Sequence, residues 1–123
     1  TAAAGVINDA QRNINTVTDI TGDQVSLQAG GEIGGTADVD VESERLIAIS
    51  NSGNIAINEA TGTDFGIVLA SSGTVTLTAD DTSTVSSVTG IAPGGATPDV
   101  DITLTTGDLE IDSIIAVTDA SLT

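Results

Sequence analysis

Hydrophobic and polar residues alternate along most of this chain, and the alternation recurs in four similar segments. In each segment an alternating run leads into a short turn, and a second alternating run follows the turn. Such alternation is typical of β-strands with one buried face. The segments are 25–33, 47–57, 67–77 and 102–111.

A glycine in the turn of each segment gives the spacing of the repeat. Gly31 and Gly53 lie 22 residues apart, Gly53 and Gly73 lie 20 apart, and Gly107 follows 34 residues after Gly73. The long last interval contains the stretch 90–98, which is rich in Gly and Pro and which we interpret as an inserted loop. Tight corners often require a positive φ, which glycine adopts without steric penalty, and we expect it at these turns.

Copies at this spacing predict stacked coils rather than separate hairpins. We therefore expect an all-β fold, a parallel β-solenoid of about four to six coils with a period of 20–22 residues, forming one domain over 1–123. A third strand per coil is expected at 39–41, 84–88 and 114–117. Residues at equivalent positions should stack in two interior ladders, one of Leu27, Ile49, Leu69 and Leu104, the other of Ile33, Ile55, Val75 and Leu109. The expected outward residues include Ser26, Thr76, Thr78 and Thr103.

The first twenty residues fit two interpretations. The apolar residues Ala3, Ile7, Ala10, Ile14 and Val17 have the spacing of an amphipathic helix, which would act as a cap. The same stretch also alternates like a strand. We favour an irregular first coil at 1–20 over a capping helix.

The composition predicts a narrow, regular core and an acidic surface. Phe65 is the only aromatic residue, so the interior must be filled by small and β-branched aliphatic side chains. The net charge of -16 disfavours binding to nucleic acid and to anionic membranes. No apolar run approaches the length of a membrane span, so we expect no membrane insertion.

Several phrases of the sequence resemble the filamentous-haemagglutinin-type repeats of giant bacterial surface and secreted proteins. They lie at 5–10, 25–34, 52–57 and 72–79, and the resemblance extends over roughly residues 5 to 123. It implies a right-handed parallel β-helix, a location outside the cell at the bacterial surface, and a role as a stalk or fibre without catalytic residues. The loop at 90–98 and the irregular spacing depart from the family pattern.

The residue types exclude most catalytic chemistry. The chain contains no His, Cys, Lys or Tyr, which removes the usual triads, Schiff bases and zinc sites. Two carboxylate pairs, Asp99 with Asp101 and Asp108 with Glu110, have a spacing that a glycosidase could use. Sugar sites generally also offer aromatic platforms, and we expect that the chain is not an enzyme.

Acidic residues alternate with aliphatic ones in two places. Side chains two apart on a strand share a face, so each group should line one side of its strand. Two interpretations stay open: a solvated outer face, or capture of Ca²⁺, the only cofactor that the sequence suggests. The candidate metal ligands are Asp38, Asp40, Glu42 and Glu44 in the first group, and Asp108, Glu110 and Asp112 in the second.

The expected function is structural: an extracellular stalk or spacer of a bacterial surface adhesin. The alternatives are a self-assembling subunit of an extracellular filament or surface layer, and a β-sandwich adhesin domain. The expected partners are neighbouring repeats of the same chain, or identical subunits stacked end to end. Contacts with a host or neighbouring cell would be made by other domains.

Overall fold

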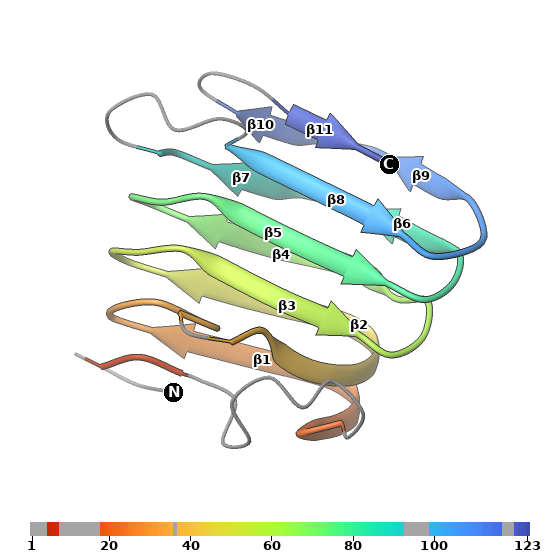
Figure 1. The fold of residues 1–123 in the computed structure, drawn as a ribbon, viewed down its shortest axis with the longest axis horizontal. Helices are drawn as coiled ribbons and strands as arrows, with labels where there is room; N and C mark the ends of the chain where they lie inside the picture. The colour runs from red at the N-terminus through yellow and green to blue at the C-terminus, as the bar shows by residue number, and fades with distance from the viewer. Residues whose placement is uncertain (1–4, 8–17, 36, 93–98, 117–119) are drawn as a thin grey trace.

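The computed structural model describes residues 5–7, 18–35, 37–92, 99–116 and 120–123, which form strands and no helix. The strands stack as coils with a period of about 20 residues and about five turns, which makes the fold a β-solenoid. Figure 1 shows the stack from the side. The strands are β1 (Ile20–Ala29), β2 (Val39–Ser50), β3 (Ile55–Glu59), β4 (Asp64–Ala70), β5 (Val75–Ala79), β6 (Ser83–Val85), β7 (Val88–Gly90), β8 (Val100–Leu104), β9 (Leu109–Ile111), β10 (Ile114–Ala116) and β11 (Ala120–Leu122).

Each coil contributes to three faces, which we name after a strand in each. The β5 face consists of β3, β5, β8 and β11, and the β4 face consists of the second halves of β1 and β2, then β4, β7 and β10. The short β6 face contains β6, β9 and the first residues of β4. All pairs between named strands are parallel, as a coiled path requires. The β-sandwich alternative, which needs antiparallel sheets, is therefore wrong.

Aliphatic ladders fill the space between the faces. On the β5 face the predicted ladder of Ile33, Ile55 and Val75 is confirmed, and all three side chains are fully buried. Its next member is Val100. A second ladder on this face stacks Val39, Ile57, Leu77 and Ile102. On the β6 face Phe65 lies between Leu46 and Val85, so the single ring fills the core at a corner.

The predicted ladder of Leu27, Ile49, Leu69 and Leu104 is wrong. Leu27 is buried, but it stacks on Ala48, Val68 and Val88. Ile49 and Leu69 do pair with each other, on the outer surface, where both are half-buried. At these positions of β2 and β4 the larger Ile49 and Leu69 therefore lie outside, and the smaller Ala48 and Val68 lie inside.

A β-bulge at Gly66 sets which residues of β4 point inward. Leu46 pairs with Phe65 and Ile47 pairs with Ile67, so Gly66 is an extra residue without a partner in β2. The bulge keeps Phe65 and Val68 inside while Ile67 turns outward, with 43% of its surface exposed.

The predicted equivalence of the fourth repeat with the other three is wrong, because its turn lies at a different corner of the coil. Gly107 lies between the β5 and β6 faces, where it packs against Thr82, whereas Gly53 and Gly73 lie between the β4 and β5 faces. As a result Leu104 stacks on Ala79, and Leu109 stacks on Ser83 rather than on Val75. Gly73 forms an isolated antiparallel bridge with Ile91 in the next coil.

The turn glycines are required for two different reasons. Gly53 has φ 137° and Gly107 has φ 86°, as predicted, but neither Gly31 nor Gly73 has a positive φ. Gly73 is needed because the chain passes very close to the coil below. A Cβ at this position would lie 2.3 Å from the carbonyl oxygen of Gly53.

The third-strand prediction is correct only in part: residues 86–87 lie between β6 and β7, residue 117 lies outside the described residues, and the three segments do not occupy equivalent positions. Residues 39–41 start β2 beneath β3, residues 84–85 belong to β6, and residues 114–116 form β10 on the β4 face. Of the predicted loop at 90–98, Gly90 ends β7 and residues 93–98 lie outside the described residues. Of the first twenty residues, Gly5–Ile7 continue the β5 face, with the Ile33 bridge to Ile7. Most of the other residues in this stretch, on which the capping-helix alternative depends, also lie outside the described residues.

Candidate functional site

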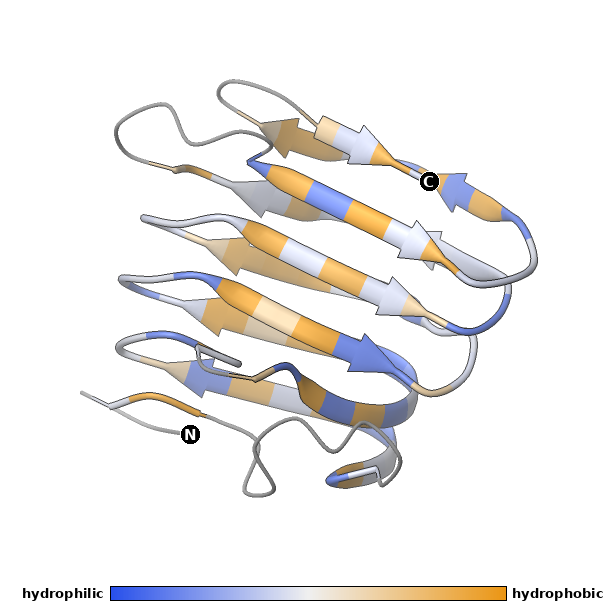
Figure 2. Cartoon of the chain, in the orientation of Figure 1, coloured by the Kyte–Doolittle hydropathy of each residue, from blue (hydrophilic) through white to orange (hydrophobic). Residues whose placement is uncertain are grey.

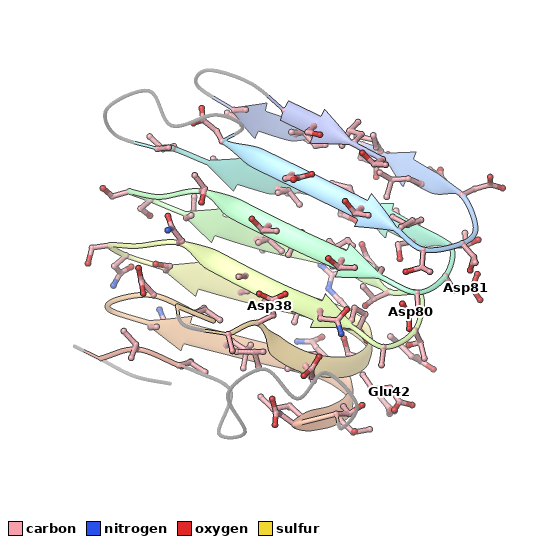
Figure 3. The ribbon with its side chains drawn as sticks, viewed as in Figure 1. Asp38, Glu42, Asp80 and Asp81 are labelled. Carbon is pink, nitrogen blue, oxygen red and sulfur yellow. The ribbon has the colours of Figure 1, made fainter. Side chains whose placement is uncertain are left out.

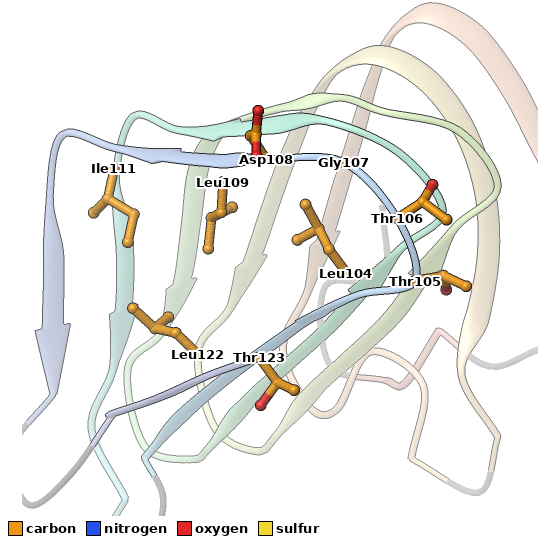
Figure 4. Close-up of a pocket in the computed structure, with 9 residues that line it drawn as sticks. All are labelled: Leu104, Thr105, Thr106, Gly107, Asp108, Leu109, Ile111, Leu122 and Thr123. Atoms are coloured by element: carbon orange, nitrogen blue, oxygen red, sulfur yellow. The ribbon is translucent and has the colours of Figure 1, made fainter.

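A cavity of about 400 Å³ opens at the C-terminal end of the described stack. Figure 4 shows its floor of aliphatic side chains and its rim of Thr105, Thr106, Asp108 and Thr123. The floor consists of the last members of four interior columns, in which Leu104 lies over Ala79, Leu109 over Ser83, Ile111 over Val85, and Leu122 over Ile102.

These side chains are more exposed than their equivalents in lower coils. Ile111 is 41% exposed and Leu122 is 47% exposed, whereas Val85 and Ile102 are fully buried. Within the described residues, β9, β10 and β11 each pair with a strand on one side only. An aliphatic floor beside free strand edges has the geometry that accepts a further coil.

The first acidic group does not lie on one flat face. Asp40 is buried, and its Oδ1 accepts a hydrogen bond from Asn58 Nδ2 at 2.7 Å. Burial raises the pKa of the half-buried Asp38, and the nearby charge of Asp40 raises it further. Strand β2 then bends, and Glu42 and Glu44 are exposed at the corner beside β1. Figure 3 shows Asp38 and Glu42 well apart.

The second acidic group lies on the last described coil. Asp108, Glu110 and Asp112 are all exposed, and Asp108 lines the rim of the terminal cavity. Across the described ranges, no three acidic side chains converge so that they could hold a metal ion. Calcium binding by two carboxylates and a solvated outer face both stay predictions, and the buried Asp40 does not fit a solvated face. Of the two pairs considered for glycosidase chemistry, Asp99 is buried and Asp101 half-buried.

A buried polar cluster at the corner between the β5 and β6 faces was not predicted. Glu59 is fully buried, and its two oxygens accept hydrogen bonds from the backbone N of Ser43 at 2.7 Å and from Ser43 Oγ at 3.0 Å. Ser43 Oγ also lies 3.3 Å from Thr63 Oγ1, and the backbone N of Thr63 donates to Ser83 Oγ at 3.2 Å. The hydroxyls therefore form a column along the stack.

Burial raises the pKa of Glu59 to about 7, and the charge of Glu42 adds to the rise, while the hydrogen bonds from Ser43 oppose it. A carboxyl with this pKa changes charge near neutral pH. The sequence held a signal for it. Glu59 follows Ile55 and Ile57 at the inward positions of one strand, and hydroxyl residues recur 20 residues apart at positions 43, 63 and 83.

Comparison of the chain with models of protein families, with curated proteins and with solved structures gives no match. The resemblance to filamentous-haemagglutinin-type repeats therefore rests on the sequence phrases and on the shared solenoid fold. Within the described ranges no helix is long and apolar enough to span a membrane.

Proposed function

We propose that this chain is an extracellular structural segment, a stalk or spacer of a bacterial surface adhesin of the filamentous-haemagglutinin type. The observation that carries the proposal is the stack itself, in which parallel coils with continuous aliphatic ladders form a body that lengthens by one strand spacing per coil. The acidic surface fits a solvated rod, and no catalytic role is proposed for any residue.

The spacer function predicts that length grows linearly with the number of copies. Five coils at ~4.8 Å give a height of about 24 Å per copy. We therefore expect the maximum dimension of chains with one, two and four tandem copies, measured by small-angle X-ray scattering, to rise by about this amount per copy. Growth with the square root of copy number, as for flexibly linked modules, would contradict the proposal.

The second candidate function is a self-assembling subunit of an extracellular filament or surface layer. It is favoured by the terminal cavity, where Leu122 and Ile111 would contact the first coil of the next subunit. Light scattering and electron microscopy of the single chain at rising concentration test it. Leu122→Asp should prevent filament growth, while Thr76→Asp, which adds the same charge to an exposed position of β5, should not.

A further inference from the structure

The β4 face carries aliphatic side chains on its outer surface. Ile47 pairs with Ile67 and Ile49 pairs with Leu69, all four pointing outward from β2 and β4. Ile115, on β10, is 55% exposed on the same face, two coils further along. We call Ile47, Ile49, Ile67 and Leu69 the lateral patch, which Thr89 of β7 separates from Ile115.

The other two faces present polar side chains instead. The outward positions of the β5 face are mostly polar, among them Asn58, Thr76 and Asp101, and those of the β6 face include Asp64 and Glu110. In Figure 2 the ribbon of β8 has a hydrophilic segment between hydrophobic ones, and the ribbon of β5 alternates between hydrophobic and near-neutral colours. The lateral patch is therefore specific to one side of the stack.

The β4 face is also free of charge. The strand residues that form it, at 25–29, 46–50, 67–70, 88–90 and 114–116, include no acidic or basic side chain, although the whole chain carries 18 acidic residues. At its border Arg45 Nη1 donates to Asp64 Oδ2 at 2.9 Å, and this ion pair adds no net charge. The molecule has a net charge of -16, so two copies repel each other least where a face without charged residues meets its counterpart.

We infer that the lateral patch is a contact surface for a second copy of this chain, which packs side by side through the same face. Two copies repel each other wherever acidic faces meet, and the β4 face is where aliphatic side chains can meet without that repulsion. A two-fold arrangement is self-complementary, because each patch supplies the apolar surface that the other needs. A basic partner would favour the acidic faces instead.

The size of the patch sets the strength of the pairing. Four aliphatic side chains on two neighbouring strands cover far less than the ~800 Å² per partner of a stable complex. Pairing of single chains should therefore be weak and concentration-dependent, and it should strengthen when salt screens the acidic surfaces. Lateral pairing is independent of end-to-end stacking. The inference therefore goes beyond the proposed spacer function, because it joins two rods side by side.

Sedimentation equilibrium from about 10 μM to about 1 mM protein, at low and high NaCl, tests the inference. We expect a monomer–dimer equilibrium whose association constant rises with salt. Ile67→Asp and the uncharged Ile67→Thr should each lower this constant at least about tenfold, because both remove a central aliphatic contact. Thr76→Asp is the matched control for added charge, and Leu122→Asp controls for contacts through the end. Both should leave the constant nearly unchanged.

Three results would overturn the inference. A native chain that stays monomeric at about 1 mM in high salt shows no lateral pairing. Association that Leu122→Asp abolishes and Ile67→Asp does not would place the contact at the end of the stack. A chain that stays monomeric but binds phosphatidylcholine vesicles, with binding lost in Ile67→Asp, would assign the patch to a lipid surface. Circular dichroism of each variant confirms that it folds.

Discussion

At the scale of single residues, Glu59 links the stability of the coil stack to pH. Its folded-state pKa of about 7 lies above the ordinary value of 4.5, so the folded state holds the proton more tightly than the unfolded state. Its contribution to the free energy of unfolding is fully present below about pH 4.5 and is lost as pH rises to about 7. A difference of this size corresponds to about 3 kcal/mol.

Glu59→Gln should remove this dependence while it keeps the shape of the side chain. Urea unfolding of the native chain and of the variant at pH 5, 6, 7 and 8 measures the effect. We expect the native chain to lose stability relative to the variant between pH 5 and pH 7, and the difference to level off by pH 8. Comparing the two chains at each pH cancels the repulsion among the exposed acids. A difference that does not change with pH would show that Glu59 titrates as an ordinary carboxyl.

Substitution by Asp should destabilise the fold strongly at Val68 of β4 and only slightly at its neighbour Leu69. Val68 is 1% exposed and stacks between Ala48 and Val88, so Val68→Asp buries an unpaired charge and should cost several kcal/mol. Leu69 points outward, and Leu69→Asp should cost less than about 1 kcal/mol. Denaturant titration of the two variants decides the matter, since equal losses would mean that the faces of β4 are assigned incorrectly.

At the scale of the elements, how far the sequence predicts the fold depends on how clearly polar and apolar positions alternate. Val75–Ala79 alternates with threonines, and the predictions that Val75 points inward and that Thr76 and Thr78 point outward are confirmed. Residues 67–70 are apolar at every position, so alternation could not show which side faces inward. The bulge at Gly66 and the misaligned corner at Gly107 depend on contacts between coils, which no single segment reveals.

The candidate sites could be predicted only in part from the sequence, because their geometry also depends on the register between coils. Alternate spacing over residues 38–44 placed Asp38, Asp40, Glu42 and Glu44 on one face, but β2, which begins at Val39, bends at a corner and separates them. The Glu59 cluster joins residues from three successive coils, so it became visible only when the register was known.

The corner between the β4 and β5 faces tolerates no side chain at Gly73. Gly73→Ala would force its Cβ against the backbone of Gly53, and we expect a loss of more than about 2 kcal/mol. Gly22→Ala is the matched control, because a Cβ there meets its nearest atoms at an ordinary 3.6 Å. The control should change stability by no more than about 0.5 kcal/mol. Thermal unfolding of both variants tests this, and similar melting temperatures would argue against the close approach of the two turns.

At the scale of the whole molecule, two interpretations of the exposed acids stay open: a solvated surface, or capture of Ca²⁺ by two carboxylates. A solvated surface predicts that Ca²⁺ and NaCl of equal ionic strength raise the melting temperature equally. A larger increase with millimolar Ca²⁺, lost in Glu42→Gln or in Asp108→Asn, would instead identify a site formed by two carboxylates.

The central claim is that successive coils stack in parallel register, even where residues 93–98, outside the described residues, separate two of them. The chain has no cysteine, so introduced pairs report directly on the register. Thr76 and Asp101 are partners on β5 and β8, whereas Thr103 lies two residues further along β8. Neighbouring strands are ~4.8 Å apart, within the range for a disulfide, and a shift of two residues places Cα atoms beyond ~7 Å.

The most direct measurement is therefore the rate of disulfide formation in two double variants under mild oxidation. We predict fast, intramolecular and nearly complete bonding for Thr76→Cys with Asp101→Cys, and little for Thr76→Cys with Thr103→Cys. Equal bonding in the two variants, or bonding only in the second, would contradict the parallel stacking on which the fold and the proposed function depend.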